Sequence, residues 1–143
     1  MPRLFGAGLD KAQSMRLDNW NTLLNKHFQS IGPFKWGEND CCMFSVECVK
    51  VITGVDHGTE YRGYRSASGA YKVLKTYDGV EGIATRQLGQ PKPITQANRG
   101  DVVSFKNGEQ IALGICLGDK IAAIGEYGLI FMPISVGIKS WSV

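Results

Sequence analysis

The sequence predicts an α+β fold in which helices precede an antiparallel sheet. Before residue 90 the apolar residues recur at helical spacing, and after Gly100 they form short strand-like runs. Between these halves, Gly89 and the two prolines of segment 91–93 break the pattern. Helices followed by several short strands are typical of α+β domains, so we expect the helices to pack on a sheet of about five strands.

Four helices are expected, at about residues 14–30, 41–53, 70–77 and 81–88. The first places Trp20, Leu24 and Phe28 on one stripe and stops before Gly32 and Pro33. The second is apolar over most of its circumference, which indicates a buried central helix.

Five strands are expected, at about residues 102–105, 111–117, 121–124, 129–132 and 138–143. In the second of these, the small residues Ala112, Gly114 and Cys116 share one face. A face of small side chains lets a helix approach closely, so we expect the helix of residues 41–53 to lie there.

Length and composition favour one folded domain over residues 1–143, because 43% of the residues are hydrophobic and 20% are charged. The net charge of +3 comes without a run of five like charges, so charge indicates no nucleic-acid partner. No run of about 18 apolar residues exists for membrane insertion, and the first residues do not resemble a signal peptide. We therefore expect a protein that folds in a cytoplasm.

The four cysteines are Cys41, Cys42, Cys48 and Cys116. Their spacing fits neither a zinc site nor a disulfide framework, so no metal and no cofactor are expected. Cys41 differs from the others because it falls in the first turn of a helix, directly after Asp40, a candidate N-cap. Helix-start N–H groups lower a thiol pKa and can hold an oxyanion, whereas the charge of Asp40 opposes thiolate formation. Cys41 is thus a candidate nucleophile.

The segment 34–41 resembles the signature of NlpC-type cell-wall endopeptidases, which belong to the papain-like superfamily. That signature is aromatic-x-Trp-Gly leading to Asp-Cys, and here residues 34–37 read Phe-Lys-Trp-Gly before Asp40 and Cys41. A second signature is a Gly-Asp entry to the sheet followed by a strand that starts His-x-Gly. Here Gly-Asp stands at residues 100–101, and residues 112–114 read Ala-Leu-Gly.

The order of the motifs is similar to a small phage and prophage family of NlpC-related proteins encoded among tail-tip genes. The segments that carry this resemblance are 36–42, 61–64, 99–103 and 112–116, with a closing Trp141. The resemblance implies a papain-like NlpC-type fold for a core of residues 34–143, with residues 1–33 as an N-terminal helical extension.

The chain departs from the peptidase family where that family carries its general-base histidine, because Ala112 stands there. A cysteine nucleophile of this type needs an imidazole to take its proton. His57 follows the helix that Cys41 begins, about 18 Å away. His27 lies on the apolar stripe of the first helix, where a packed histidine is the simpler interpretation, although it stays the candidate replacement base.

A basic and aromatic cluster is the candidate binding surface, because Tyr and Arg are favoured at protein interfaces. Its members are Trp36, Tyr61, Arg62, Tyr64 and Arg65.

The resemblance implies that the chain is a structural or docking module of a phage tail tip or tail assembly. It also implies that the protein is a pseudoenzyme and that its partners are other tail proteins. Such a protein would occupy the host cytoplasm during assembly and then the virion tail. One alternative is an active cysteine endopeptidase or amidase that cuts peptidoglycan cross-links with Cys41, its base coming from His27 or a partner chain. Another is a host-directed inhibitor or adaptor.

Overall fold

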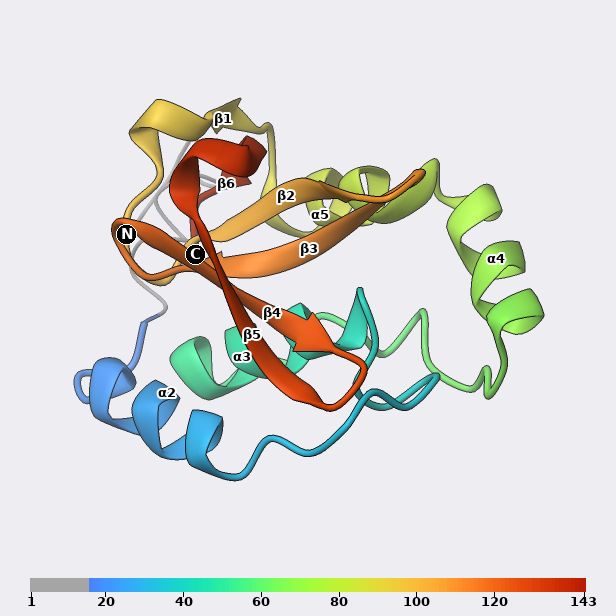
Figure 1. Cartoon of the computed structure of the whole chain (residues 1–143), viewed down its shortest axis with the longest axis horizontal. Helices are drawn as coiled ribbons and strands as arrows, with labels where there is room; N and C mark the ends of the chain where they lie inside the picture. The colour runs from blue at the N-terminus through green and yellow to red at the C-terminus, as the bar shows by residue number, and fades with distance from the viewer. Residues whose placement is uncertain (1–15) are drawn as a thin grey trace, which may run out of the picture.

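All described α-helices precede all strands along the chain in a computed structural model that describes residues 16–143 (Figure 1). The described helices are α2 (Trp20–Gln29), α3 (Met43–Thr53), α4 (Ala67–Thr76) and α5 (Gly79–Leu88). The strands are β1 (Lys92–Pro93), β2 (Val102–Asn107), β3 (Gln110–Cys116), β4 (Lys120–Gly125), β5 (Gly128–Pro133) and β6 (Gly137–Trp141). Two 3-10 turns, η1 (Ile94–Gln96) and η2 (Ile134–Val136), complete the described elements. The α+β prediction is confirmed. The first helix begins later than expected, at Trp20, because residues 16–19 form a bend and a turn; residues 14 and 15 of the expected helix lie outside the described residues.

The sheet of the described chain has six strands in the order β1-β6-β2-β3-β4-β5, and every pair is antiparallel. The expectation of about five strands was therefore one short. The additional strand is β1, in which Lys92 pairs with Ser140 and Pro93 with Lys139. The sequence obscured β1 because a proline is usually a strand breaker, yet a sheet tolerates proline on an edge strand, which is where β1 lies.

Helix α3 lies in the centre of the molecule between α2 and the sheet (Figure 1). Eight of its eleven residues are buried, as expected of a helix that is apolar around most of its circumference. On one side Phe44 stacks on Phe28 of α2, with 6.4 Å between the ring centroids. Leu24 of α2 is fully buried in the same core, so α2 packs on α3.

The face of the sheet that receives α3 is not the one expected. Leu113 and Ile115 belong to the main core with α3, whereas Ala112 and Cys116 belong to a smaller cluster on the opposite face. Large side chains bury more apolar surface against a helix, which explains why the bulky face receives α3. The small face is covered instead by Ile94 of η1, Ile134 of η2 and Met132 of β5.

A buried carboxylate, Asp101, joins the two ends of the described chain to the sheet. Its Oδ1 accepts hydrogen bonds from Arg16 at 3.0 Å and from the Val143 backbone N–H at 3.1 Å. Its Oδ2 accepts from Lys92 Nζ at 2.8 Å and from the Asn98 backbone N–H at 2.9 Å. Both carboxylate oxygens are therefore fully used in holding distant segments together.

None of the described helices has the length and apolar character needed to cross a membrane.

Candidate functional site

Asp40 is the most completely bonded side chain near the start of α3. It is fully buried, and its Oδ1 accepts from the backbone N–H groups of Cys42 at 3.0 Å and Met43 at 2.8 Å. Its Oδ2 accepts from the Gly37 N–H at 2.8 Å and from the Tyr64 hydroxyl at 2.5 Å. Asp40 thus caps the first turn, although the regular helix begins three residues later at Met43.

Cys41 lies where β3 and β4 diverge. The ladder between these strands contains only the pairs Ile115–Ala122 and Cys116–Ile121. Beyond it, the backbone N–H of Leu113 in β3 donates to the carbonyl of Cys41 at 3.1 Å. The segment before α3 therefore lies where the two strands separate. There the Cys41 carbonyl, and not a carbonyl of β4, accepts the hydrogen bond from Leu113.

The Cys41 side chain packs against the small cluster that contains Ala112. This puts the candidate nucleophile beside the position where the NlpC-type signature has its histidine. The apolar neighbours remove water from the thiol, and the Asp40 carboxylate is adjacent in the chain. Burial and then the charge of Asp40 raise the pKa of the Cys41 thiol to about 11, with a smaller opposing effect from its own backbone. Cys41 is therefore a neutral thiol at physiological pH.

Two surface hollows meet at Cys41. The larger, of about 700 Å³, lies beneath α4 and includes Trp36, Tyr71 and Lys75 in its lining. The smaller, of about 430 Å³, lies between the diverging strands and includes Ala112 and Ile130. Together they give the Cys41 region an open, mostly apolar surface with a few charged groups at its rim.

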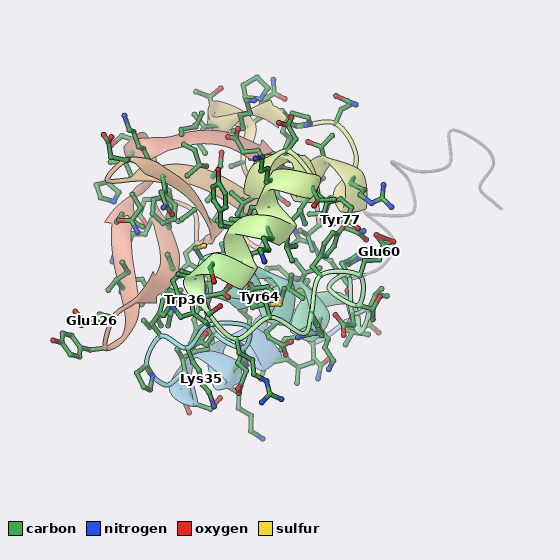
Figure 2. The ribbon with its side chains drawn as sticks, turned by 90° about the vertical axis from the view of Figure 1, so that its right-hand side faces the viewer. Lys35, Trp36, Glu60, Tyr64, Tyr77 and Glu126 are labelled. Atoms are coloured by element: carbon green, nitrogen blue, oxygen red, sulfur yellow. The ribbon has the colours of Figure 1, made fainter. Side chains whose placement is uncertain are left out.

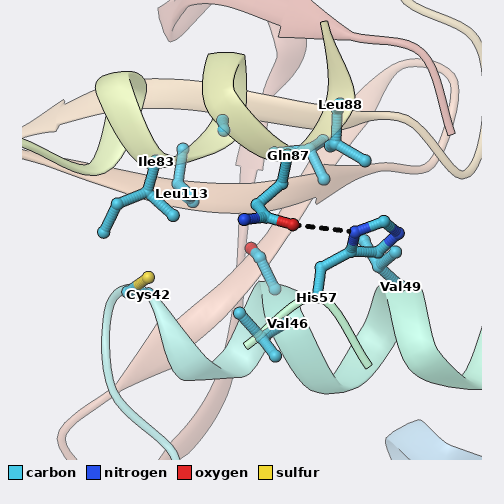
Figure 3. Close-up of a pocket in the computed structure, with 11 residues that line it drawn as sticks. Cys42, Val46, Val49, His57, Ile83, Gln87, Leu88 and Leu113 are labelled. Carbon is cyan, nitrogen blue, oxygen red and sulfur yellow. Dashed lines mark hydrogen bonds between the residues drawn. The ribbon is translucent and has the colours of Figure 1, made fainter. Parts of the chain in front are cut away.

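Neither histidine reaches this surface, since neither lines either of the two hollows at Cys41. His57 instead lines a different pocket, between α3 and α5, where its Nδ1 lies 3.2 Å from Oε1 of Gln87 (Figure 3). The Gln87 amide donates in turn to the Tyr61 hydroxyl at 2.7 Å. Cys42, not Cys41, is the cysteine that lines the His57 pocket.

His27 is half-buried on α2, and its Nε2 is enclosed without a hydrogen-bond partner among the described residues. Burial lowers the pKa of His27, while the carboxylate of Glu47 opposes that shift. The imidazole is thus kept neutral by packing. His27 is therefore a partly buried side chain of α2 that lies away from the hollows at Cys41.

The aromatic and basic cluster is divided by the fold. Tyr61 is only 1% exposed and packs edge-on against Tyr77, with 4.9 Å between the ring centroids. Arg62 is an exposed residue whose side chain, 33% accessible, forms ion pairs with Glu47 at 2.6 Å and Asp56 at 3.0 Å. These two residues therefore hold the loop between α3 and α4 in place.

The remaining members of the cluster stay together near one end of α4. Figure 2 shows Trp36 and Tyr64 beside α4, with Lys35 on the neighbouring turn. Trp36 lines the larger hollow at Cys41, and with Arg65 it lines a further hollow on the surface. The part of the predicted cluster that remains available for binding is thus Trp36 and Arg65, while Tyr64 is tied to Asp40.

Sequence reasoning did not foresee the hydrogen bond between Tyr64 and Asp40, which are 24 positions apart. The usable signal was the buried carboxylate itself, since Asp40 is followed by an apolar helix and needs donors when it is buried. Within residues 16–143, no three His, Cys, Asp or Glu side chains gather closely enough to hold a metal ion.

A comparison with protein families matches residues 15–143 to a family described as Domain of unknown function (DUF6950). No curated protein and no solved structure matches the chain.

Proposed function

This chain belongs to the DUF6950 family, and we propose that it is a structural or docking module of a phage or prophage tail. In this proposal the fold is a papain-like NlpC-type scaffold whose cysteine site has lost its base, which makes the protein a pseudoenzyme. Its partners are other proteins of the tail tip or tail hub, and its final location is the virion tail.

The observation that carries the proposal is the pairing of Cys41 with Ala112 in a hollow that neither His27 nor His57 lines. A cysteine peptidase requires a general base within hydrogen-bond reach of its thiol. Alanine has no group that accepts a proton. A thiol with a pKa raised to about 11 also lacks the thiolate character of a nucleophile.

Asp40 does not supply the missing base. Each of its carboxylate oxygens already accepts two hydrogen bonds, and all four donors belong to the folded chain. Protonation of Asp40 would therefore break its bonds at the start of α3. The negative charge of Asp40 also opposes ionisation of Cys41.

The two hollows at Cys41 support a docking function in place of catalysis. The larger includes Trp36 and Tyr71, which offer aromatic surface, and it also includes Lys75 and Asp78. Aromatic anchors surrounded by charged groups are typical of protein interfaces. A tail protein that inserts a side chain here would use the shape of a peptidase cleft without its chemistry.

The first test measures alkylation of each cysteine by iodoacetamide as a function of pH, with site-resolved mass spectrometry. We expect Cys41 to react only as pH approaches the thiol pKa of about 11. Rapid reaction of Cys41 down to about pH 5, far below the pKa of about 8.5 of a free thiol, would instead indicate an active thiolate. Loss of that reaction in His27→Ala would establish the peptidase alternative.

Ala112→His tests whether the rest of the cysteine site persists. The introduced imidazole would face the hollow that Cys41 also lines, so the pKa of Cys41 should fall and its alkylation at neutral pH should accelerate at least tenfold. Ala112→Asn is the matched control, because its side chain is polar and similar in length but is not a base. Equal rates in the two variants would contradict a degenerate peptidase site.

The assignment to the tail is tested by proteomics of purified particles. We expect the chain in intact particles from a strain that encodes it, and particles from a deletion strain should lack infectivity. Detection only in the host lysate, with unaltered particles in the deletion strain, would overturn the assignment and favour the host-directed adaptor.

A further inference from the structure

An uncharged apolar strip runs over β5, η2 and the start of β6. Residues 127–138 contain no Asp, Glu, Lys or Arg. Of the seven large hydrophobic side chains that are exposed in the described chain, five belong to this strip. They are Tyr127, Ile130, Phe131, Val136 and Ile138. Three of these side chains, Tyr127, Ile130 and Phe131, belong to the β4–β5 hairpin, and exposed apolar side chains gathered on one hairpin are typical of an interaction site.

β5 is also the last strand of the sheet and pairs only with β4. The loop between α2 and α3 touches the β4–β5 hairpin at its turn, where the Phe34 N–H donates to the Glu126 carbonyl at 3.2 Å. Figure 2 shows Glu126 at the outer end of this hairpin. No hydrogen bond from that loop, or from any other described residue outside β4, reaches the backbone of Leu129 or Phe131.

The direction of the free backbone groups follows from the hairpin register. The hairpin has a two-residue turn closed by the pair Gly125–Gly128, so this pair and every second pair after it exchange backbone hydrogen bonds. Ile130 therefore bonds to β4, whereas the N–H and C=O groups of Leu129 and Phe131 point away from it. Pro133 falls in the same outward series and has no N–H to lose, as expected on a strand edge.

We propose that the β5 edge binds the β5 edge of a second copy of this chain, so that the two sheets continue across a two-fold axis at Ile130. In this antiparallel register Leu129 of one copy lies opposite Phe131 of the other. Both residues point their backbone groups outward, so each such pair exchanges two hydrogen bonds. The symmetry produces this pair twice, as an isologous interface requires.

The absence of charge favours a second copy as the occupant. Proteins usually protect a strand edge with lysine or another charge, and this strip has neither. A strip without charge offers no complementary group to a charged partner strand, yet it can face itself without repulsion although each chain carries +3 overall. The Leu129–Phe131 pairs also bring aliphatic and aromatic side chains together across the junction.

Sedimentation velocity of the full chain over a range of about 1 to 500 μM measures the association. An interface based on one short strand falls at the small end of specific interfaces, so we expect a reversible dimer with a Kd of order 10 μM. A chain that remains monomeric over this range would overturn the proposal. The measurement uses the isolated protein, so its outcome is independent of whether the chain acts in a tail.

Three substitutions of Phe131, which is 54% exposed, locate the interface. Phe131→Lys puts two like charges near the axis and should weaken the dimer at least tenfold. Phe131→Ala removes only the ring, whereas Phe131→Pro also removes an outward N–H that the fold does not use. We therefore expect Phe131→Pro to weaken the dimer more than Phe131→Ala, with far-UV circular dichroism unchanged in each.

Leu17→Lys is the control, because Leu17 is an exposed hydrophobic side chain, 40% accessible, that lies outside residues 127–138 and outside the hollows at Cys41. We expect it to leave the dimer unchanged. A dimer that Leu17→Lys weakens as much as Phe131→Lys, or one that no Phe131 variant weakens, would place the contact elsewhere and overturn the proposal.

Discussion

The hydroxyl of Tyr64 donates a hydrogen bond to Oδ2 of Asp40 at 2.5 Å and so joins the loop before α4 to the start of α3. A hydrogen bond to a buried carboxylate is among the stronger ones in proteins. Burial, followed by this bond and the charge of Asp40, raises the pKa of Tyr64, so the phenol remains a donor at any physiological pH. The same bond takes Tyr64 out of the predicted binding cluster and completes the set of donors around Asp40.

Tyr64→Phe should lower the free energy of unfolding by about 1.5 to 3 kcal/mol, because it removes a hydrogen bond to a charged acceptor and keeps the ring. Urea denaturation measures the change. Tyr71→Phe is the control, since its ring is largely exposed on α4, and it should cost less than about 0.5 kcal/mol. Equal losses in the two variants would show that the bond to Asp40 contributes nothing.

Asp40→Asn should lower the pKa of Cys41, because it removes a charge that opposes ionisation of the thiol. Burial remains, so the pKa should stay above that of a free thiol. The pH dependence of alkylation reports the shift, and Glu38→Gln removes an exposed carboxylate from the same turn as a control. An unchanged Cys41 profile in Asp40→Asn would mean that burial alone sets the thiol pKa.

Asp101→Asn should lower the free energy of unfolding by about 3 to 5 kcal/mol, because it leaves Arg16 and Lys92 without their buried counterion. Glu60→Gln removes one partner of the exposed Arg86 pair and should leave the free energy of unfolding nearly unchanged, because water screens an exposed ion pair. Chemical denaturation of both variants makes the comparison. A loss below about 1 kcal/mol for Asp101→Asn would contradict the role of this carboxylate as the junction of the fold.

Gly114→Ala should destabilise the protein by about 1 to 3 kcal/mol through overpacking. A Cβ at Gly114 would lie 2.6 Å from the carbonyl oxygen of Ala122 and 2.6 Å from Cγ2 of Ile121. Gly32→Ala is the control, because nothing lies within 4 Å of a Cβ there, and it should be close to neutral. Thermal unfolding of both variants tests whether the close approach of β4, and not of a helix, explains the small residue.

The protein should lose stability as pH rises above about 9. Burial is the largest cause of a raised pKa at Cys41, Cys42 and Cys48, so the unfolded chain releases these protons at a lower pH than the folded one. Their contribution to stability is complete below the unfolded pKa and declines as pH rises toward the folded values. The melting temperature measured from pH 7 to 11 should fall, and the slope should be shallower in Cys48→Ala. A melting temperature that stays constant to pH 11 would contradict this prediction.

The positions of the helices and of five strands could be predicted because each depends on a local pattern. The apolar positions of α3 follow the helical period, and Gly54 ends that helix in a left-handed conformation. Turn residues bound the strands in the same way. The β1 pairing with β6 was missed because strand pairing joins residues that are 48 positions apart, Lys92 and Ser140, and leaves no local pattern.

For the cysteine site, the sequence alone determined that Cys41 follows a capping carboxylate at a helix start and that position 112 holds alanine. Local hydrogen bonding and residue identity are sufficient for both statements. Only the tertiary structure decided that Cys41 packs beside Ala112, that Tyr64 completes the donors of Asp40, and that His57 faces a different pocket. Those relationships depend on which face of β3 receives α3, and burial of the larger apolar surface determines that choice.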